Sequence, residues 1–89
     1  RMSGYNTERV RLRLSLKARN LLIEEFPLAE KDVAKVDITH WELDTKIADY
    51  KGIGRFVMGL LDDIEIVGSP EFEKYIKDEL KKICKKYNL

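Results

Sequence analysis

Residues 9–16 read Arg-Val-Arg-Leu-Arg-Leu-Ser-Leu, with an apolar side chain at every even position. Such alternation is typical of a strand with one buried and one solvated face, because successive side chains of a strand point to opposite sides. A second alternating run covers residues 41–48, and weaker strand patterns cover residues 32–38 and 64–67. The sequence therefore predicts four strands, and the two middle ones are close enough for a hairpin that turns near residues 37–40.

Three apolar stripes with helical spacing accompany these strands. The first follows Ser15, a suitable N-cap, and ends before Pro27, because proline cannot donate the next hydrogen bond and restricts the residue before it. The second covers residues 53–61. The third starts at Ser69-Pro70, with Ser69 expected as the N-cap. Its stripe consists of Phe72, Ile76, Leu80, Ile83 and Tyr87.

The order strand, helix, strand, strand, helix, strand and a last helix predicts an α+β fold. With right-handed crossovers it gives a ferredoxin-like βαββαβ sandwich with an additional C-terminal helix. Both core helices then cover one face of a four-stranded antiparallel sheet, and the first and third strands are central neighbours. We expect one such domain at residues 9–89, preceded by a linker or a cloning remnant at residues 1–8.

Composition narrows the class of protein. The chain has 89 residues, 44% hydrophobic and 37% charged, which excludes a two-domain enzyme and disfavours a deep preformed cavity. No apolar run exceeds three residues, so no membrane span is expected. The lone Cys84 cannot form an internal disulfide, which favours a reducing, cytoplasmic compartment. No metal or cofactor is expected.

Charge is nearly balanced overall but uneven along the chain. The net charge is +1, from 17 Lys and Arg against 16 Asp and Glu, so it does not by itself indicate nucleic-acid or membrane binding. Residues 1–20 carry six positive charges and one negative charge, whereas residues 21–50 carry three positive and eight negative charges. The predicted topology would bring these two regions together on one sheet surface.

Several stretches resemble a known family. Residues 9–15 and the following helix, which ends in Glu25-Phe26-Pro27-Leu28, are similar to the opening of the C-terminal extension (WCX-type) domain of bacterial WYL-domain transcriptional regulators. Residues 50–60 (Tyr-Lys-Gly-Ile-Gly-Arg-Phe-Val-Met-Gly-Leu), 63–67 and 69–72 resemble that family's second helix, last strand and proline-led terminal helix. The resemblance covers Glu8 to about Lys82.

The resemblance implies a non-catalytic module that follows a helix-turn-helix domain and a WYL sensor domain in the same chain. Such modules help the regulator to dimerise and help to relay or complete effector binding. The implied partners are a second copy and the upstream domains, with DNA contacted only through the missing N-terminal domain. Trp41-Glu42-Leu43 is not the Trp-Tyr-Leu signature of the sensor.

Two groups of residues are candidates for a ligand or partner surface. Arg9, Arg11 and Arg13 could hold an anionic or nucleotide effector, since the planar guanidinium suits phosphate oxygens. Cross-strand pairing with Glu42 and Asp44 is the favoured alternative, because acidic neighbours compete with an anion.

The second group lies at a helix start, in the sequence Lys-Gly-Ile-Gly-Arg at residues 51–55. Gly52, Gly54 and Arg55 offer free backbone N–H groups and a cation, which are ingredients of an anion site. The string has neither the Gly-Lys-Ser/Thr ending of a P-loop nor the third glycine of a dinucleotide fingerprint. Glycines that permit a tight turn and close packing are the favoured interpretation.

The remaining candidates do not form a catalytic set. Trp41 shares its strand face with Leu43, so it is expected in the core, with an interface anchor as the alternative. His40 has no second His or Cys near it in sequence, and Cys84 is interpreted as a small apolar residue. Two further hypotheses stay open beside the regulator module: a module that binds single-stranded nucleic acid, and a ferredoxin-like domain that binds a small molecule.

Overall fold

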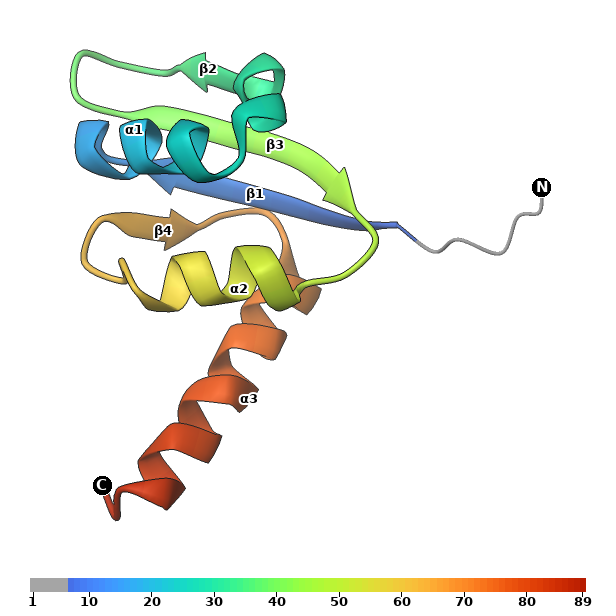
Figure 1. The fold of residues 1–89 in the computed structure, drawn as a ribbon, viewed down its shortest axis with the longest axis vertical. Helices are drawn as coiled ribbons and strands as arrows, with labels where there is room; N and C mark the ends of the chain where they lie inside the picture. The colour runs from blue at the N-terminus through green and yellow to red at the C-terminus, as the bar shows by residue number, and fades with distance from the viewer. Residues whose placement is uncertain (1–6) are drawn as a thin grey trace, which may run out of the picture.

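The computed structural model describes residues 7–89 as a sheet of four strands with helices (Figure 1). The elements are β1 (Glu8–Leu14), α1 (Leu16–Glu25), the 3-10 helix η1 (Pro27–Asp32), β2 (Val33–Lys35), β3 (Trp41–Ile47), α2 (Lys51–Met58), β4 (Ile64–Ile66) and α3 (Pro70–Lys86). Strand β1 begins at Glu8, the last residue of the expected linker, and residues 1–6 of that linker lie outside the described residues. All seven predicted elements are present, whereas η1 was not predicted.

The four strands form one antiparallel sheet in the order β2-β3-β1-β4. The prediction that β1 and β3 are neighbours at the centre is confirmed, with Leu12 opposite Leu43. Strand β2 is shorter than expected because η1 occupies the residues before it and a turn follows it. In that turn the Val36 N–H donates to the His40 carbonyl at 3.0 Å, and Asp37 Oδ1 accepts from the Thr39 N–H at 2.8 Å.

The core lies on one face of the sheet, between the strands and helices α1 and α2. The alternation that predicted β1 is confirmed, because Val10, Leu12 and Leu14 are fully buried. They join side chains from the other elements in one cluster, which includes Ala18, Leu22, Leu43, Ile53, Phe56, Val57, Ile64, Phe72 and Ile76. The opposite face of the sheet therefore carries the charged residues of β1, β3 and β4 together with Ala34 of β2, and α1 and α2 lie on the other side (Figure 1).

The start of α1 follows the prediction. Ser15 is the N-cap, and its hydroxyl accepts a hydrogen bond from the Ala18 N–H at 3.1 Å. The same hydroxyl donates to Asp63 Oδ1 at 3.1 Å, and the Ser15 N–H donates to the Asp63 carbonyl at 3.0 Å. Ser15 thus joins the end of β1 to the loop before β4. Helix α1 ends at Glu25, and Pro27 opens η1.

The prediction of a side-chain cap at the start of α3 is wrong. Ser69 occupies the N-cap position, but its side chain makes no hydrogen bond to its own helix. The residue is buried against β1, where its hydroxyl donates to the Val67 carbonyl at 3.1 Å and accepts from the Arg11 N–H at 3.4 Å. These bonds attach the start of α3 to the edge of β1 where the short strand β4 has ended.

Only the first half of α3 packs in the core. Phe72 and Ile76 are buried, whereas Ile83 is 41% and Tyr87 62% exposed. At about 1.5 Å per residue the 17-residue helix is about 25 Å long, so its C-terminal half extends beyond the sandwich (Figure 1). The predicted stripe of α3 therefore meets the core only as far as Leu80, which is partly buried. Cys84 is exposed on this half.

Candidate functional site

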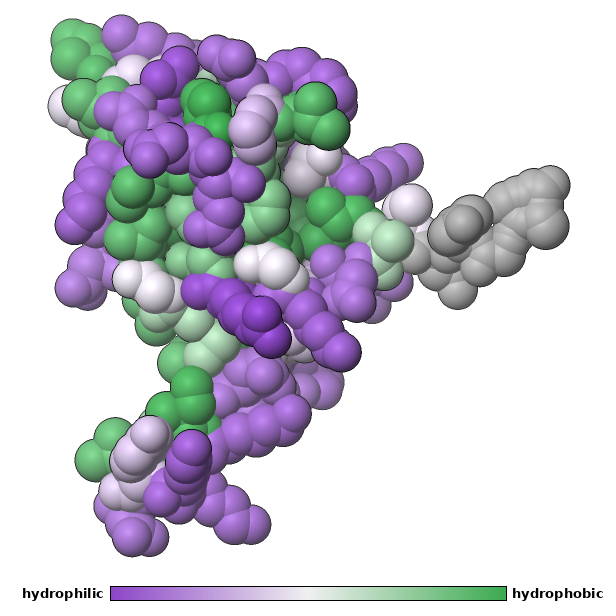
Figure 2. Space-filling model, in the orientation of Figure 1, coloured by the Kyte–Doolittle hydropathy of each residue, from purple (hydrophilic) through white to green (hydrophobic). Residues whose placement is uncertain are grey.

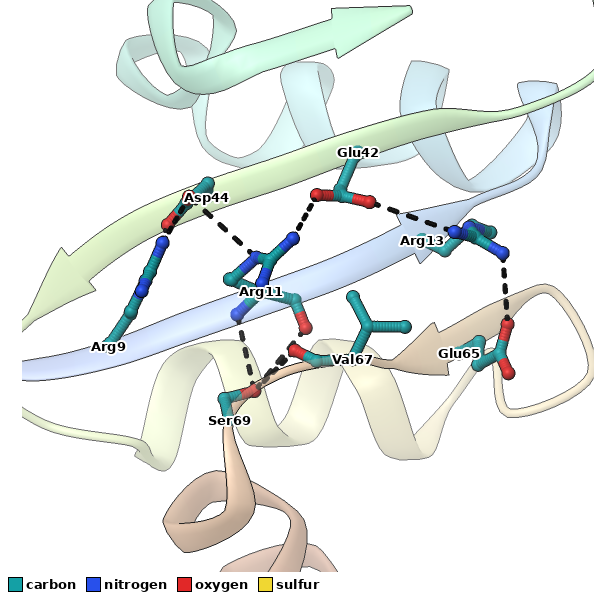
Figure 3. A network of polar contacts seen from close by, with 8 residues as sticks. All are labelled: Arg9, Arg11, Arg13, Glu42, Asp44, Glu65, Val67 and Ser69. Atoms are coloured by element: carbon teal, nitrogen blue, oxygen red, sulfur yellow. Dashed lines mark hydrogen bonds and ion pairs between the residues drawn. The ribbon is translucent and has the colours of Figure 1, made fainter. Parts of the chain in front are cut away.

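The open face of the sheet carries a ladder of paired charges (Figure 3). The register puts Arg11 opposite Asp44 and Arg13 opposite Glu42 on β3. Arg9 makes a two-pronged contact with Asp44, from Nε to Oδ1 at 3.0 Å and from Nη2 to Oδ2 at 2.7 Å. Arg11 Nη2 donates to Glu42 Oε1 at 2.8 Å. The predicted cross-strand pairing of these residues is present.

Arg13 is held more loosely than the other two arginines. Its guanidinium lies between two carboxylates, 4.0 Å from Glu42 Oε2 and 3.9 Å from Glu65 Oε1 on β4. The Arg13 side chain is 45% exposed and that of Glu65 is 68% exposed, whereas Glu42 is 18% exposed. Glu42 is therefore the buried carboxylate of the ladder, shared by two arginines, and Arg13 is the arginine with the longest ion-pair distances, although Arg9 at 55% is more exposed.

Titration behaviour follows from these pairs. The hydrogen bond from Arg9 holds the pKa of Asp44 below its usual range, and the positive charges of Arg9 and Arg11 add to this effect. The same hydrogen bond raises the pKa of the Arg9 guanidinium. Both groups stay charged at neutral pH, so an anion that binds this row has to compete with carboxylates already in contact.

The start of α2 lies on the opposite side of the sheet from the arginine row. The Lys51 N–H donates to Asp49 Oδ1 at 2.7 Å, so a carboxylate of the chain itself already occupies the helix N-terminus. Gly54 is buried, and a Cβ added there would lie 2.8 Å from Cε2 of Tyr75. Gly52 has more room, with Phe26 at 3.8 Å from an added Cβ. Close packing therefore explains Gly54, in agreement with the favoured interpretation.

The six candidate residues consequently do not converge on one site. Arg9, Arg11 and Arg13 lie on the open sheet face, whereas Gly52, Gly54 and Arg55 belong to the helix layer. Arg55 is exposed and lies one turn beyond Lys51, whose N–H is bound by Asp49.

Trp41 and His40 have local structural partners. Trp41 is partly buried against the core, as expected, and Lys35 Nζ lies 5.5 Å from the centre of its ring. His40 Nδ1 lies 3.1 Å from Asp37 Oδ1 and 2.9 Å from Thr39 Oγ1. The backbone N–H of Thr39 lowers the pKa of Asp37. Within residues 7–89, no group of three or more His, Cys, Asp or Glu side chains is arranged to hold a metal ion.

An aromatic cluster, which was not predicted from the sequence, joins α3 to the core. The ring centre of Tyr50 lies 5.1 Å from that of Phe72 and 5.2 Å from that of Tyr75. The Tyr50 hydroxyl donates to Glu8 Oε2 at 3.4 Å, and burial raises the pKa of that phenol. Tyr50 precedes α2 and Tyr75 lies outside the predicted stripe of α3, so no periodic pattern indicated that the two rings meet.

Two hollows in the helix layer were also not predicted from the sequence. The larger, about 490 Å³, lies between α1 and α2, and the smaller, about 290 Å³, lies over β3 beside η1. The first is lined by Leu21, Glu24, Glu25, Arg55, Phe56, Gly59 and Leu60. Figure 2 shows apolar residues on this side of the molecule between polar ones. Leu21 and Leu60 belong to the predicted apolar stripes of α1 and α2, and stripe spacing alone did not indicate that a hollow lies between the two helices.

No protein-family model matches the sequence, and neither the curated proteins nor the solved structures contain a match. Within residues 7–89, no helix has both the length and the apolar composition needed to cross a membrane.

Proposed function

We propose that the chain is the C-terminal dimerisation and effector-relay module of a bacterial WYL-type transcriptional regulator, without catalytic activity of its own. The observation that carries this proposal is the resemblance from Glu8 to about Lys82, whose matching stretches lie in β1, α1, α2, β4 and the start of α3. The partners are then a second copy and the helix-turn-helix and WYL domains of the same regulator. Such a regulator works in the cytoplasm, and the exposed thiol of Cys84 is compatible with a reducing compartment.

We assign the fold to the ferredoxin-like class as part of the same proposal. Six elements follow the order βαββαβ before α3, and the sheet order β2-β3-β1-β4 has the first and third strands at its centre. Two split strand-helix-strand units with their helices on one face account for this order.

Several residues in the stretches that carry the resemblance pack or connect the helices, and these structural roles support a non-catalytic module. Gly54 permits contact between α2 and Tyr75, and Pro27 ends α1. Ser69 connects the start of α3 to β1 through the Arg11 backbone. None of these roles requires a reacting group, and all of them fix how the helices are held on the sheet.

The pairing of the arginines disfavours the nucleic-acid alternative. Sheets of this kind that bind single strands stack bases on exposed aromatic side chains. In β1 and β3 the open-face residues are charged, and the one aromatic residue of these strands, Trp41, lies on the core side. Arg9 and Arg11 already contact Asp44 and Glu42.

The test removes residues 9–89 from the regulator that contains them. We expect the truncated protein to lose dimerisation and effector response, and to bind its operator more weakly, because the module joins two copies. Sedimentation gives the mass, and operator titration with and without effector gives the response. Unchanged mass, response and operator affinity would show that the proposed role is wrong. Saturable binding of short single-stranded oligonucleotides by the isolated chain, abolished by Arg11→Ala, would favour the alternative.

A further inference from the structure

The C-terminal half of α3 presents an apolar stripe that its own domain does not cover. Leu80 is only partly buried, and Ile83 and Tyr87 are 41% and 62% exposed. The spacing of these residues places them on one side of the helix. Figure 2 shows this side of α3 as apolar residues that continue below the body of the domain. Of the nearby lysines, Lys86 and Lys81 lie closest to the stripe on its two sides, whereas Lys85 lies on the opposite side of the helix and Lys82 pairs with Glu79 at 2.7 Å.

The groove between α1 and α2 has the complementary character. Its apolar floor includes Leu21, which is 36% exposed, together with Phe56 and Leu60. Its α1 wall carries Glu24 and Glu25, which outnumber the single cation Arg55 among its lining residues. An amphipathic helix with basic flanks is the partner that such a groove fits.

We propose that the C-terminal half of α3 docks in the α1/α2 groove of a second copy of this chain, and that the second copy returns the same contact. This inference rests on the proposed function, which requires a dimer, and names the surface that forms it. Ile83 and Tyr87 then contact Leu21 and Leu60, while Lys81 and Lys86, which lie closest to the stripe, approach Glu24 and Glu25. The residues that α3 leaves exposed and those that the groove leaves exposed are buried together.

The helix cannot occupy the groove of its own domain. Phe72 and Ile76 fix the first half of α3 in the core, and Ser69 attaches its start to β1. The helix is continuous to Lys86, so its end is carried away from α1 (Figure 1). Folding back would require a break in the helix, so we expect another molecule to cover the exposed half.

Two equivalent contacts, each between the α3 end of one copy and the groove of the other, allow a short helix to form a stable dimer. Stable complexes bury about 1,200–2,000 Å² in total, more than the ten residues from Leu80 to Leu89 offer in one groove. Two equivalent contacts double the buried area. They also close the assembly at two copies, since an unreturned contact would propagate into a chain of molecules.

Sedimentation equilibrium of the 89-residue chain tests the proposal. The wild type should show a dimer, and Ile83→Asp in the arm or Leu21→Asp in the groove should each weaken it at least tenfold. Both side chains are substantially exposed, so thermal melts should show that the variants still fold. Lys17→Glu, an exposed charge change at the other end of α1, is the control and should leave the dimer unchanged.

Mixing and charge reversal identify the surface. Equal amounts of Ile83→Asp and Leu21→Asp should recover part of the association as a heterodimer, because one intact arm then meets one intact groove. Glu24→Lys with Glu25→Lys should weaken the dimer at least tenfold, and adding Lys81→Glu with Lys86→Glu should restore it.

The opposite results are equally clear. A monomeric wild type overturns the proposal. A dimer that the groove substitutions do not weaken also overturns it, because the two copies would then pair through their α3 helices or through another surface. Oligonucleotide binding by a monomer through the lysines would assign α3 to nucleic acid instead. The proposed regulator role is judged separately by the truncation, so a dimer formed elsewhere refutes the docking site and leaves the role standing.

Discussion

Replacing Gly54 by alanine is expected to destabilise the domain, although alanine is the better helix former. An added Cβ at this buried position would lie 2.8 Å from Cε2 of Tyr75 and 3.7 Å from its Cδ2 and Cζ. The Tyr75 ring cannot move freely, because Tyr50 lies against it at 5.2 Å and Phe72 at 6.3 Å between ring centres. The methyl group therefore has to push α2 away from α3 or disturb the aromatic cluster.

The magnitude follows from two opposed effects. Alanine gains up to about 1 kcal/mol over glycine in a helix interior. Overpacking a well-packed site costs about 1–3 kcal/mol. We expect a net loss of about 1 kcal/mol, which for a domain of this size lowers Tm by about 5 °C.

Gly52→Ala is the matched control in the same helix. Its added Cβ would meet Phe26 only at 3.8 and 3.9 Å, an ordinary contact, and the residue is exposed. We expect a gain of about 0.5 kcal/mol, less than the full propensity difference because the position is in the first turn. Thermal and urea denaturation followed by circular dichroism measures both variants. A Gly54→Ala protein as stable as Gly52→Ala would refute the packing argument.

Three further perturbations test the polar contacts. Ser15→Ala should lower the free energy of unfolding by about 1 kcal/mol, because the helix cap is lost, and urea denaturation gives the value. Glu42→Gln should cost about 0.5–1 kcal/mol by the same assay, whereas Glu65→Gln should stay within about 0.5 kcal/mol, since only Glu42 serves two arginines at low exposure. The lowered pKa of Asp44 means that its contribution to stability is present above its unfolded pKa of about 3.9 and is lost as the pH falls through the lower folded value. An NMR titration of the Asp44 carboxyl carbon should find that lower pKa and should find it restored toward its usual range in Arg9→Met; an unshifted pKa in the wild type would contradict the pairing.

The sequence predicted the strands and helices well where periodicity and stop signals agreed. Residues 9–16 alternate without interruption, and the buried side chains of β1 follow that alternation. The pairing of Arg11 with Glu42 followed from the predicted strand order, because neighbouring β1 and β3 place the arginines and the carboxylates on the same face of the sheet. Ser69 does not cap α3 with its side chain because its hydroxyl is engaged by the Val67 carbonyl at 3.1 Å and by the Arg11 backbone at 3.4 Å.

The exposed half of α3 and the α1/α2 groove were harder to predict, because both depend on where helices and strands end in the folded domain. A stripe such as Leu80, Ile83 and Tyr87 has the same spacing whether a core covers it or not, so sequence alone could not show that the sheet ends first. The groove between α1 and α2 likewise depends on how far apart two helices are held. Gly54 indicated close packing, but its partner Tyr75 lies on another helix and had no signal in the sequence.

The mass of the 89-residue chain in solution, measured over a wide range of concentration, decides whether the domain joins two copies. The chain mass is 10.4 kDa, and we expect sedimentation equilibrium to find twice this mass as concentration rises, with Ile83→Asp remaining at 10.4 kDa. A wild-type mass of 10.4 kDa throughout, up to millimolar concentration, would contradict the claim that this domain joins two copies.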